Sequence, residues 1–242
     1  MKYSRATVVI FVLFITFFLI SFGGCGYRKE FRELRSAKRV LSKEKKQVEE
    51  IEKIRGQLRR IIDMKIRAVE LLESADRILG RKYMEIGSYA LARDVLKEAE
   101  QLKPRNPFIK KDLGECYYLL GTSEVNKEKQ AEYFSISKKY LMKALEINPD
   151  FIEAHYALGL LLLFGYKDNE RALNEMKKVL SYDPNHIEAH FALGRIYYEM
   201  GELGKALNEY ITLLRILPKD SYRRKKVEDN IMRINQERGI HQ

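Results

Sequence analysis

Apolar residues recur at steps of three and four along most of the chain, with charged residues between them. This spacing is typical of amphipathic helices, because positions three or four apart share one helix face. From Tyr27 to Leu72 there is no proline and Gly56 is the only glycine. The pattern predicts one helix of about 45 residues there, roughly 70 Å long. Its apolar face consists of Val48, Ile51, Ile54, Leu58, Ile61, Ile62, Ile66, Val69 and Leu72.

The beginning of the chain has a different pattern. Lys2 and Arg5 precede an apolar run from Ala6 to Phe22, and Cys25 follows two glycines. A basic start, an apolar segment and small residues before a cleavage point predict a secretory signal. At about 16 residues, the run is short for the roughly 20 that span a bilayer comfortably.

This arrangement resembles the signal of bacterial lipoproteins, with Phe22 in the place where that family usually has leucine. The resemblance implies that Cys25 becomes the lipidated first residue of the mature protein. The alternatives are an uncleaved membrane helix and ordinary cleavage with release. All three predict that the body of the protein leaves the cytoplasm or lies at a membrane face. We expect a membrane-anchored protein of the bacterial cell envelope, on its periplasmic side.

The remainder of the chain repeats itself. The segment Ile152–Gly159 matches Ile187–Gly194 almost residue for residue, at an offset of 35 residues. Two copies with the same skeleton precede them. We expect about eleven extra residues around Thr122–Glu132 between the helices of the second copy, and one extra residue in the turn of the third. The skeleton consists of Leu79, Gly80, Tyr83, Ala92, Leu96, Ala99 and Pro104; Leu113, Gly114, Tyr117, Leu141, Ala144 and Pro149; Gly159, Leu162, Ala172, Met176, Val179 and Pro184; and Gly194, Tyr197, Ala206, Tyr210, Leu213 and Pro218.

This skeleton resembles the tetratricopeptide repeat, a 34-residue helix–turn–helix unit. His155 and His190 stand where the family has an early tryptophan. The resemblance implies an all-α fold, a right-handed superhelix of about four helical hairpins, preceded by a long N-terminal helix and an apolar anchor segment. The predicted segments are a signal or anchor (1–24), a basic helical stalk (25–72), a repeat domain (73–220, with units 73–106, 107–151, 152–186 and 187–220) and a capping helix with a tail (221–242).

Each recurring residue type has a physical role. The glycines and alanines allow the two helices of a hairpin to approach closely, and the prolines end the second helices because their ring cannot continue the hydrogen-bond ladder. A hairpin alone exposes an apolar face, so the hairpins must stack. Ser221–Arg238 has apolar residues on one side and charges on the other, which predicts a helix that covers the last hairpin. The apolar residues are Tyr222, Val227, Ile231 and Ile234.

In the tetratricopeptide family the first helices of successive repeats line a concave groove that holds a segment of a partner protein. The run Leu160–Phe164 is apolar on every side, so part of it needs a cover, which a partner can supply. The stalk or the capping helix folding into the groove is the alternative. Flanking arginines and a lysine suggest tolerance for an acidic ligand segment, although the asparagines of the family's carboxylate clamp are absent. The candidate partner-binding residues are Arg77, Arg81, Phe108, Lys111, Tyr118, Tyr156, Leu160, Leu163, Phe164, Phe191, Arg195 and Tyr198.

The net charge of +11 is concentrated after the apolar run, between Arg28 and Lys46. Export and the lack of interleaved aromatic residues argue against nucleic acid as a partner. Anionic lipid headgroups fit this segment better than nucleic acid does, and a solvated charged face without a partner is as consistent with the sequence as lipid binding.

Heptad-like spacing in the stalk leaves a homodimeric coiled coil open, although Arg55 and Lys65 interrupt its register.

Metal and catalytic chemistry find little support. His186 and His190 lie four residues apart, but His190 repeats the packing position of His155. Cys116 lies inside a helical pattern, which predicts a structural thiol; a disulfide with Cys25 is allowed but not required. We predict no metal, no cofactor and no enzymatic activity.

The combined pattern predicts a membrane-tethered scaffold or assembly factor that binds a protein segment in the concave groove of its repeats. The competing hypothesis is a transport-linked binding protein that encloses a small apolar ligand in its helical array.

Overall fold

The computed structural model describes residues 26–41 and 48–239. These residues belong to two compact units, one ending at Leu71 and one beginning at Leu72. The first contains α2 (Gly26–Leu41) and the beginning of α3 (Val48–Glu85). Within the described ranges, none of the helices is both long enough and apolar enough to cross a membrane. The apolar run and Cys25 lie outside the described residues.

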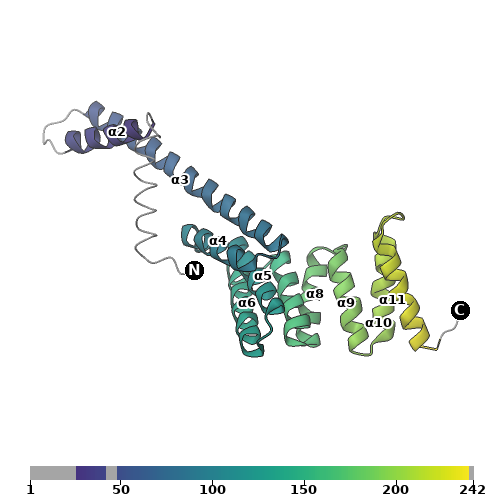
Figure 1. The fold of residues 1–242 in the computed structure, drawn as a ribbon. Helices are drawn as coiled ribbons and strands as arrows, with labels where there is room; N and C mark the ends of the chain where they lie inside the picture. The colour runs from purple at the N-terminus through teal and green to yellow at the C-terminus, as the bar shows by residue number, and fades with distance from the viewer. Residues whose placement is uncertain (1–25, 42–47, 240–242) are drawn as a thin grey trace. The chain divides into compact units, whose positions relative to one another are not determined.

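The second unit consists of helices that pair as antiparallel hairpins and stack in chain order (Figure 1). The described residues contain no strand, and the all-α fold class predicted from the sequence is confirmed. The end of α3 is followed by α4 (Tyr89–Leu102), α5 (Pro107–Ser123), α6 (Lys127–Ile147), α7 (Ile152–Leu160) with the π-helix η1 (Leu161–Tyr166), α8 (Asn169–Tyr182), α9 (Ile187–Glu199), α10 (Leu203–Ile216) and α11 (Arg223–Glu237).

The repeated glycines lie where two helices of a hairpin touch. A Cβ atom added at Gly114 would lie 2.6 Å from Cγ of Leu141, and one added at Gly194 would lie 2.7 Å from Cζ of Tyr210. Real Cβ atoms do not approach other atoms so closely, so a larger residue would separate the helices. The predicted role of these glycines is confirmed.

The prolines also lie where the sequence predicts them. The C-cap residues of α4, α6, α8 and α10 are each followed directly by a proline. Proline lacks the N–H that the next helical hydrogen bond needs, so the second helix of each hairpin ends there. These C-cap residues are Lys103, Asn148, Asp183 and Leu217.

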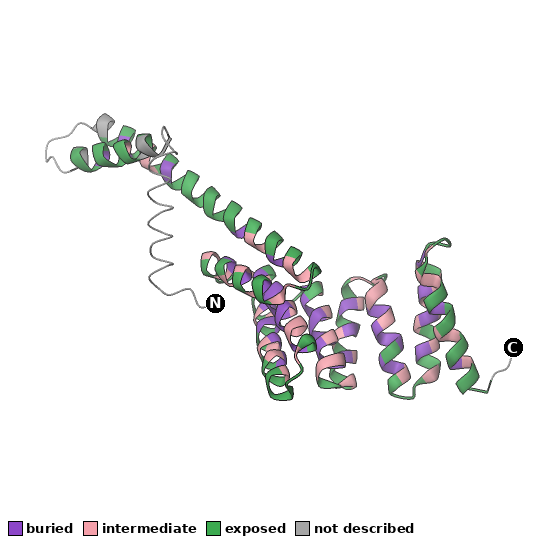
Figure 2. Ribbon diagram, in the orientation of Figure 1, coloured by how far each residue is buried: buried purple, intermediate pink, exposed green. Residues whose placement is uncertain are grey.

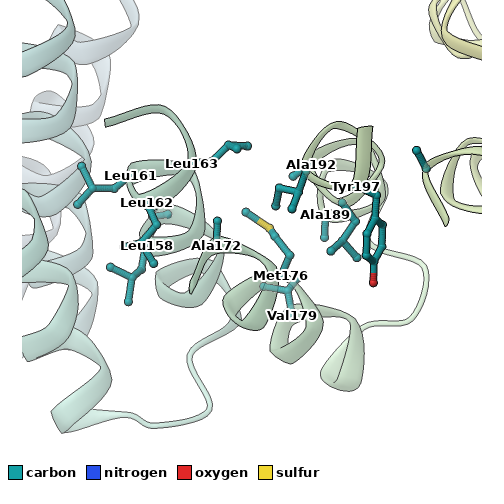
Figure 3. Close-up of a cluster of buried hydrophobic side chains, with 14 of the residues drawn as sticks. Leu158, Leu161, Leu162, Leu163, Ala172, Met176, Val179, Ala189, Ala192 and Tyr197 are labelled. Atoms are coloured by element: carbon teal, nitrogen blue, oxygen red, sulfur yellow. The ribbon is translucent and has the colours of Figure 1, made fainter. Parts of the chain in front are cut away.

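The hairpins share a core that runs along the seams between them (Figure 2). The largest cluster extends from Phe134 in α6 to Ile234 in α11 and includes Leu193, which is 2% exposed. Met176, in the same cluster, is fully buried (Figure 3). Val227 and Ile234 are buried, so α11 covers the last hairpin as predicted. Tyr222 was expected on this apolar face, but it precedes α11 and is 89% exposed.

The extra residues of the second and third repeats are accommodated inside helices. In the second repeat they lengthen α5 and α6, which contain 17 and 21 residues, and only Glu124–Asn126 separate the two helices. In the third repeat, the first helix ends in the six-residue π-helix η1 before Lys167 turns the chain with φ 56°. A π-helix takes up one more residue per turn than an α-helix, so the insertion does not displace α8 from its hairpin.

Candidate functional site

A groove of about 580 Å³ lies within the second unit, between the first helices of the last two repeats and α11. Its lining combines half-buried aromatic and aliphatic side chains with cationic ones. The lining residues are Tyr156, Leu160, Phe164, Glu188, Phe191, Ala192, Arg195, Tyr198, Glu199, Tyr210, Arg223, Lys226, Asn230, Arg233 and Ile234.

The repeat positions explain why these side chains meet. Tyr156 and Phe191 are equivalent, 35 residues apart, and each lies on the first helix of its hairpin. Leu160 and Arg195 come one turn later on the same helices. Residues four apart share a helix face, and stacking the hairpins places the two faces side by side. Burial raises the pKa of Tyr156 to about 12, so its hydroxyl stays neutral.

Six of the twelve residues predicted to bind a partner line this one groove. They come from the two most similar repeats and share half-buried or exposed side chains. They are Tyr156, Leu160, Phe164, Phe191, Arg195 and Tyr198.

Leu163 does not line the groove, in contrast to the prediction. Its side chain is 1% exposed and belongs to the main core cluster (Figure 3). The prediction assumed α-helical spacing through Leu160–Phe164, but the π-helix η1 begins at Leu161. The extra residue per turn changes which side chains share a face, and Leu161, Leu162 and Leu163 are all buried.

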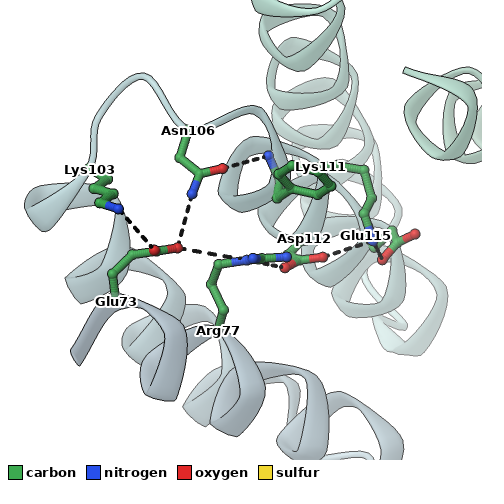
Figure 4. A network of polar contacts seen from close by, with 8 residues as sticks. Glu73, Arg77, Lys103, Asn106, Lys111, Asp112 and Glu115 are labelled. Atoms are coloured by element: carbon green, nitrogen blue, oxygen red, sulfur yellow. Dashed lines mark hydrogen bonds and ion pairs between the residues drawn. The ribbon is translucent and has the colours of Figure 1, made fainter. Parts of the chain in front are cut away.

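The other five predicted residues belong to the first two repeats and lie outside the groove lining. Arg77 donates to Asp112, with Nε 3.1 Å from Oδ2 (Figure 4). Its guanidinium lies over the ring of Phe108. Lys111 contacts Asp112 and Glu115 at 2.8 and 3.0 Å. These cations are therefore already neutralised by carboxylates. Arg81 is exposed.

The aromatic residues of this region are also in contact with neighbours. Phe108 is 45% exposed and its ring meets that of Phe151 edge-on, with centroids 4.8 Å apart. The ring of Tyr118 stacks on that of Phe134. The predicted binding residues of the first two repeats are thus paired with or packed against other residues of the chain to a greater extent than those of the last two repeats.

Charges in the groove are only partly paired. Arg223 donates to Glu188 at 2.9 Å, and Arg195 donates to Glu199 at 2.8 Å. Burial tends to raise the pKa of Glu188, but the hydrogen bond from Arg223, a backbone hydrogen bond and the nearby charges of Arg223 and His186 together outweigh it, and the pKa is lowered. Lys226 and Arg233 have no ion-pair partner among the described residues.

Sequence reasoning left the capping helix folding into the groove as an alternative, but it named none of the residues of α11 as part of the groove lining. Groove residues recur at Arg223, Lys226, Asn230 and Arg233, at steps of three and four. This second stripe beside the apolar one is the signal that could have identified α11 as a groove wall.

His155 and His190 have equivalent surroundings and are both buried. In each, Nδ1 lies near a glutamate of the second helix and Nε2 lies near a proline carbonyl of the preceding turn. In both rings each nitrogen thus lies within hydrogen-bond distance of an oxygen atom. His186 accepts a hydrogen bond from the Ala189 N–H and caps α9. Each of the three imidazoles therefore has a structural hydrogen bond.

Cys116 is fully buried, and its thiol lies 3.3 Å from the carbonyl oxygen of Tyr89. Burial raises the pKa of the thiol to about 12. The thiolate is the nucleophilic form, so this environment fits a structural cysteine.

Comparison with known proteins identifies the fold. Residues 163–226 match the tetratricopeptide repeat family model. A thermophilic tetratricopeptide repeat protein from Thermus thermophilus is similar to this chain with 22% identity and a TM-score of 0.61, over 84% of this chain and 99% of the other. The MamA protein is similar with 20% identity and a TM-score of 0.55, over 70% and 84%. A MamA double mutant gives 19% and 0.56, over 70% and 86%.

A comparison with curated proteins gives no match. At these identities the solved structures show the fold alone. The fold is the all-α tetratricopeptide type that the repeat spacing predicted.

Proposed function

We propose that this chain is a membrane-tethered scaffold or assembly factor of the bacterial envelope, which binds a segment of a protein partner in the groove of its repeats. The single observation that carries the proposal is the groove between α7, α9 and α11, where half-buried aromatic side chains face a volume of about 580 Å³.

The composition of the groove supports a protein partner. Tyrosine and arginine are among the residue types that dominate binding energy at protein interfaces, and phenylalanine is enriched there. All three types line this groove, at Tyr156, Phe191 and Arg195. A stacked array presents such positions along an extended surface, which suits a peptide segment or a helix.

The lining disfavours the competing hypothesis of an enclosed small apolar ligand. Four cationic side chains border the groove, and an apolar ligand would strip water from them without replacing their hydrogen bonds. The cations are Arg195, Arg223, Lys226 and Arg233.

The tether rests on sequence alone. The basic start, the apolar run and Cys25 support a lipid anchor or an N-terminal membrane helix. Intact-mass analysis of membrane-extracted protein tests this, because retention of residues 1–24 without an acyl mass would eliminate the lipoprotein hypothesis.

The proposal of a dimer through the stalk rests on the heptad-like spacing of its apolar residues. Sedimentation of the purified chain tests it, and a strict monomer would contradict it.

The groove is tested by affinity capture from membranes with a variant carrying Tyr156→Ala, Leu160→Ala and Phe191→Ala. We expect it to lose the partners that the unaltered chain captures while keeping its helical circular dichroism. The matched control carries Met142→Ala, Ile147→Ala and Tyr182→Ala, three exposed side chains outside the groove lining, and should capture them normally. Undiminished capture by the groove variant would refute the proposal.

A further inference from the structure

The unpaired cations of the groove come from α11, outside the repeats. Of the four cationic side chains in the lining, Arg195 and Arg223 have carboxylate partners, whereas Lys226 and Arg233 have none among the described residues. Both side chains are exposed, so each is accessible to an incoming carboxylate and can form a charge-assisted hydrogen bond with it.

Cationic side chains also lie over the aromatic rings that line the groove. The guanidinium of Arg195 lies 4.8 Å from the ring centroid of Phe164. The ring of Phe191 carries both Arg223 at 5.0 Å and Lys226 at 5.8 Å. Such contacts hold the cations over the rings. A partner therefore meets positive charge as well as apolar surface.

We infer that the partner segment is an acidic stretch of polypeptide in which two carboxylates flank apolar side chains. This inference rests on the proposed function of the groove. Lys226 and Arg233 are seven residues apart on α11, which separates their Cα atoms by about 10.5 Å along the axis. Carboxylates three residues apart on a segment in the polyproline II conformation lie on one face, because that helix has three residues per turn, and they span about 9 Å, close to this separation. The apolar side chains between them reach Leu160, Phe164 and Phe191.

The groove's own carboxylates favour a polypeptide over a uniformly charged polymer. Glu188 and Glu199 lie in the lining, and Glu237 accepts a hydrogen bond from Tyr198. Nucleic acid carries closely spaced phosphates, which these glutamates would repel. A peptide can place its acidic residues at the two unpaired cations and apolar residues elsewhere.

The test uses the full chain in detergent and three fluorescent peptides flanked by Gly-Ser. The spaced probe contains Asp-Leu-Phe-Asp, the clustered probe contains Asp-Asp-Leu-Phe, and the neutral probe contains Asn-Leu-Phe-Asn. Fluorescence anisotropy gives Kd for each. The variant carries Lys226→Gln and Arg233→Gln. The matched control carries Arg215→Gln and Lys219→Gln, which remove the same charge from exposed positions outside the lining.

We expect the spaced probe to bind most tightly, and the K226Q/R233Q variant to weaken it about tenfold, while the control changes Kd by less than about twofold. Added salt should weaken the spaced probe more than the neutral probe. Equal affinity for the spaced and neutral probes, or unchanged Kd in K226Q/R233Q, would overturn the inference. So would no binding of the spaced probe at about 1 mM, or binding of a thymidine oligonucleotide in its place.

The outcomes separate this inference from the proposed function. If partner capture depends on Tyr156, Leu160 and Phe191 but is the same in K226Q/R233Q, the groove binds a protein and the acidic assignment is wrong. If capture survives the alanine variant as well, the groove itself is not the binding site and both proposals fail.

Discussion

The carboxylate of Glu209 lies 2.7 Å from Nδ1 of His190, and Nε2 of the same ring lies 3.0 Å from the carbonyl oxygen of Pro184. The pair joins the two helices of the fourth hairpin, α9 and α10, and the proline contact joins it to the third. The same arrangement recurs between Glu175 and His155. A histidine at this repeated position thus links two neighbouring repeats through its two ring nitrogens.

This pair predicts a pH dependence of stability. The hydrogen bond that the His190 ring donates to Glu209 raises the pKa of His190 above its ordinary value of 6.5, against the opposing effect of burial. The protonated ring is therefore bound more strongly in the folded state. Its stabilisation is fully present below the pKa of the unfolded state and is lost as the pH rises through the raised pKa of the folded state. Urea unfolding between pH 5 and pH 9 should show stability falling on the alkaline side of about 6.5.

Glu209→Gln should reduce this slope and lower stability in acid by about 1.5–3 kcal/mol, the range for a hydrogen bond to a charged group. The control Glu202→Gln removes a carboxylate whose ion pair with Lys205 is exposed, and should keep the slope. A Glu209→Gln variant with the same pH profile as the unaltered chain would contradict the role of Glu209 in raising the His190 pKa.

The close approach of α9 and α10 predicts opposite effects for two glycines. A methyl group at Gly194 would lie 2.7 Å from the ring of Tyr210, whereas one at Gly204 has no neighbour within 4 Å. Gly194→Ala should destabilise the unit by about 1–3 kcal/mol through overpacking. Gly204→Ala, inside α10, should stabilise it by up to about 1 kcal/mol. Thermal unfolding of both variants measures the difference, and equal melting temperatures would contradict the packing argument.

Cys116 should be unreactive in the folded protein. Its pKa is raised to about 12 and its side chain is fully buried, so both the thiolate fraction and the access of a reagent are low. In a Cys25→Ser variant, which leaves one thiol, an aromatic disulfide reagent should give no absorbance change in buffer and one equivalent in denaturant. One equivalent released rapidly from folded protein would show that the thiol is accessible.

The fold was predictable because its determinants are steric and local. The hairpin geometry can be predicted from residue type and spacing alone. A glycine faces Leu141 in one hairpin and Tyr210 in another, and a proline follows the second helix of each hairpin. The groove residues were predictable only in the two most similar repeats, at positions such as Tyr156 and Phe191. Equivalent positions in two repeats lie on the same face of their helices, so one position predicts the other.

The rest of the site depends on features that periodicity does not contain. Whether the charged side of α11 faces solvent or the groove depends on how the array curves. Whether Arg77 is available to a ligand depends on Asp112, a buried partner 35 residues away. Leu163 was misplaced because a π-helix and an α-helix have the same sequence signature over one turn.

The end of the π-helix η1 at Lys167 predicts how a substitution there changes stability. Lys167 is the C-cap of η1 and has φ 56°, and it is the only non-glycine residue with positive φ in the described ranges. A side chain in this conformation costs roughly 1–2 kcal/mol, and glycine avoids that strain but loses more entropy on folding. We expect Lys167→Gly to stabilise the unit by about 0.5–1 kcal/mol, measured by urea unfolding. The matched control, Lys177→Gly in the middle of α8, exchanges the same residues at an exposed helical position and should destabilise by about 1 kcal/mol. If both variants lose stability equally, the left-handed turn is not what ends η1.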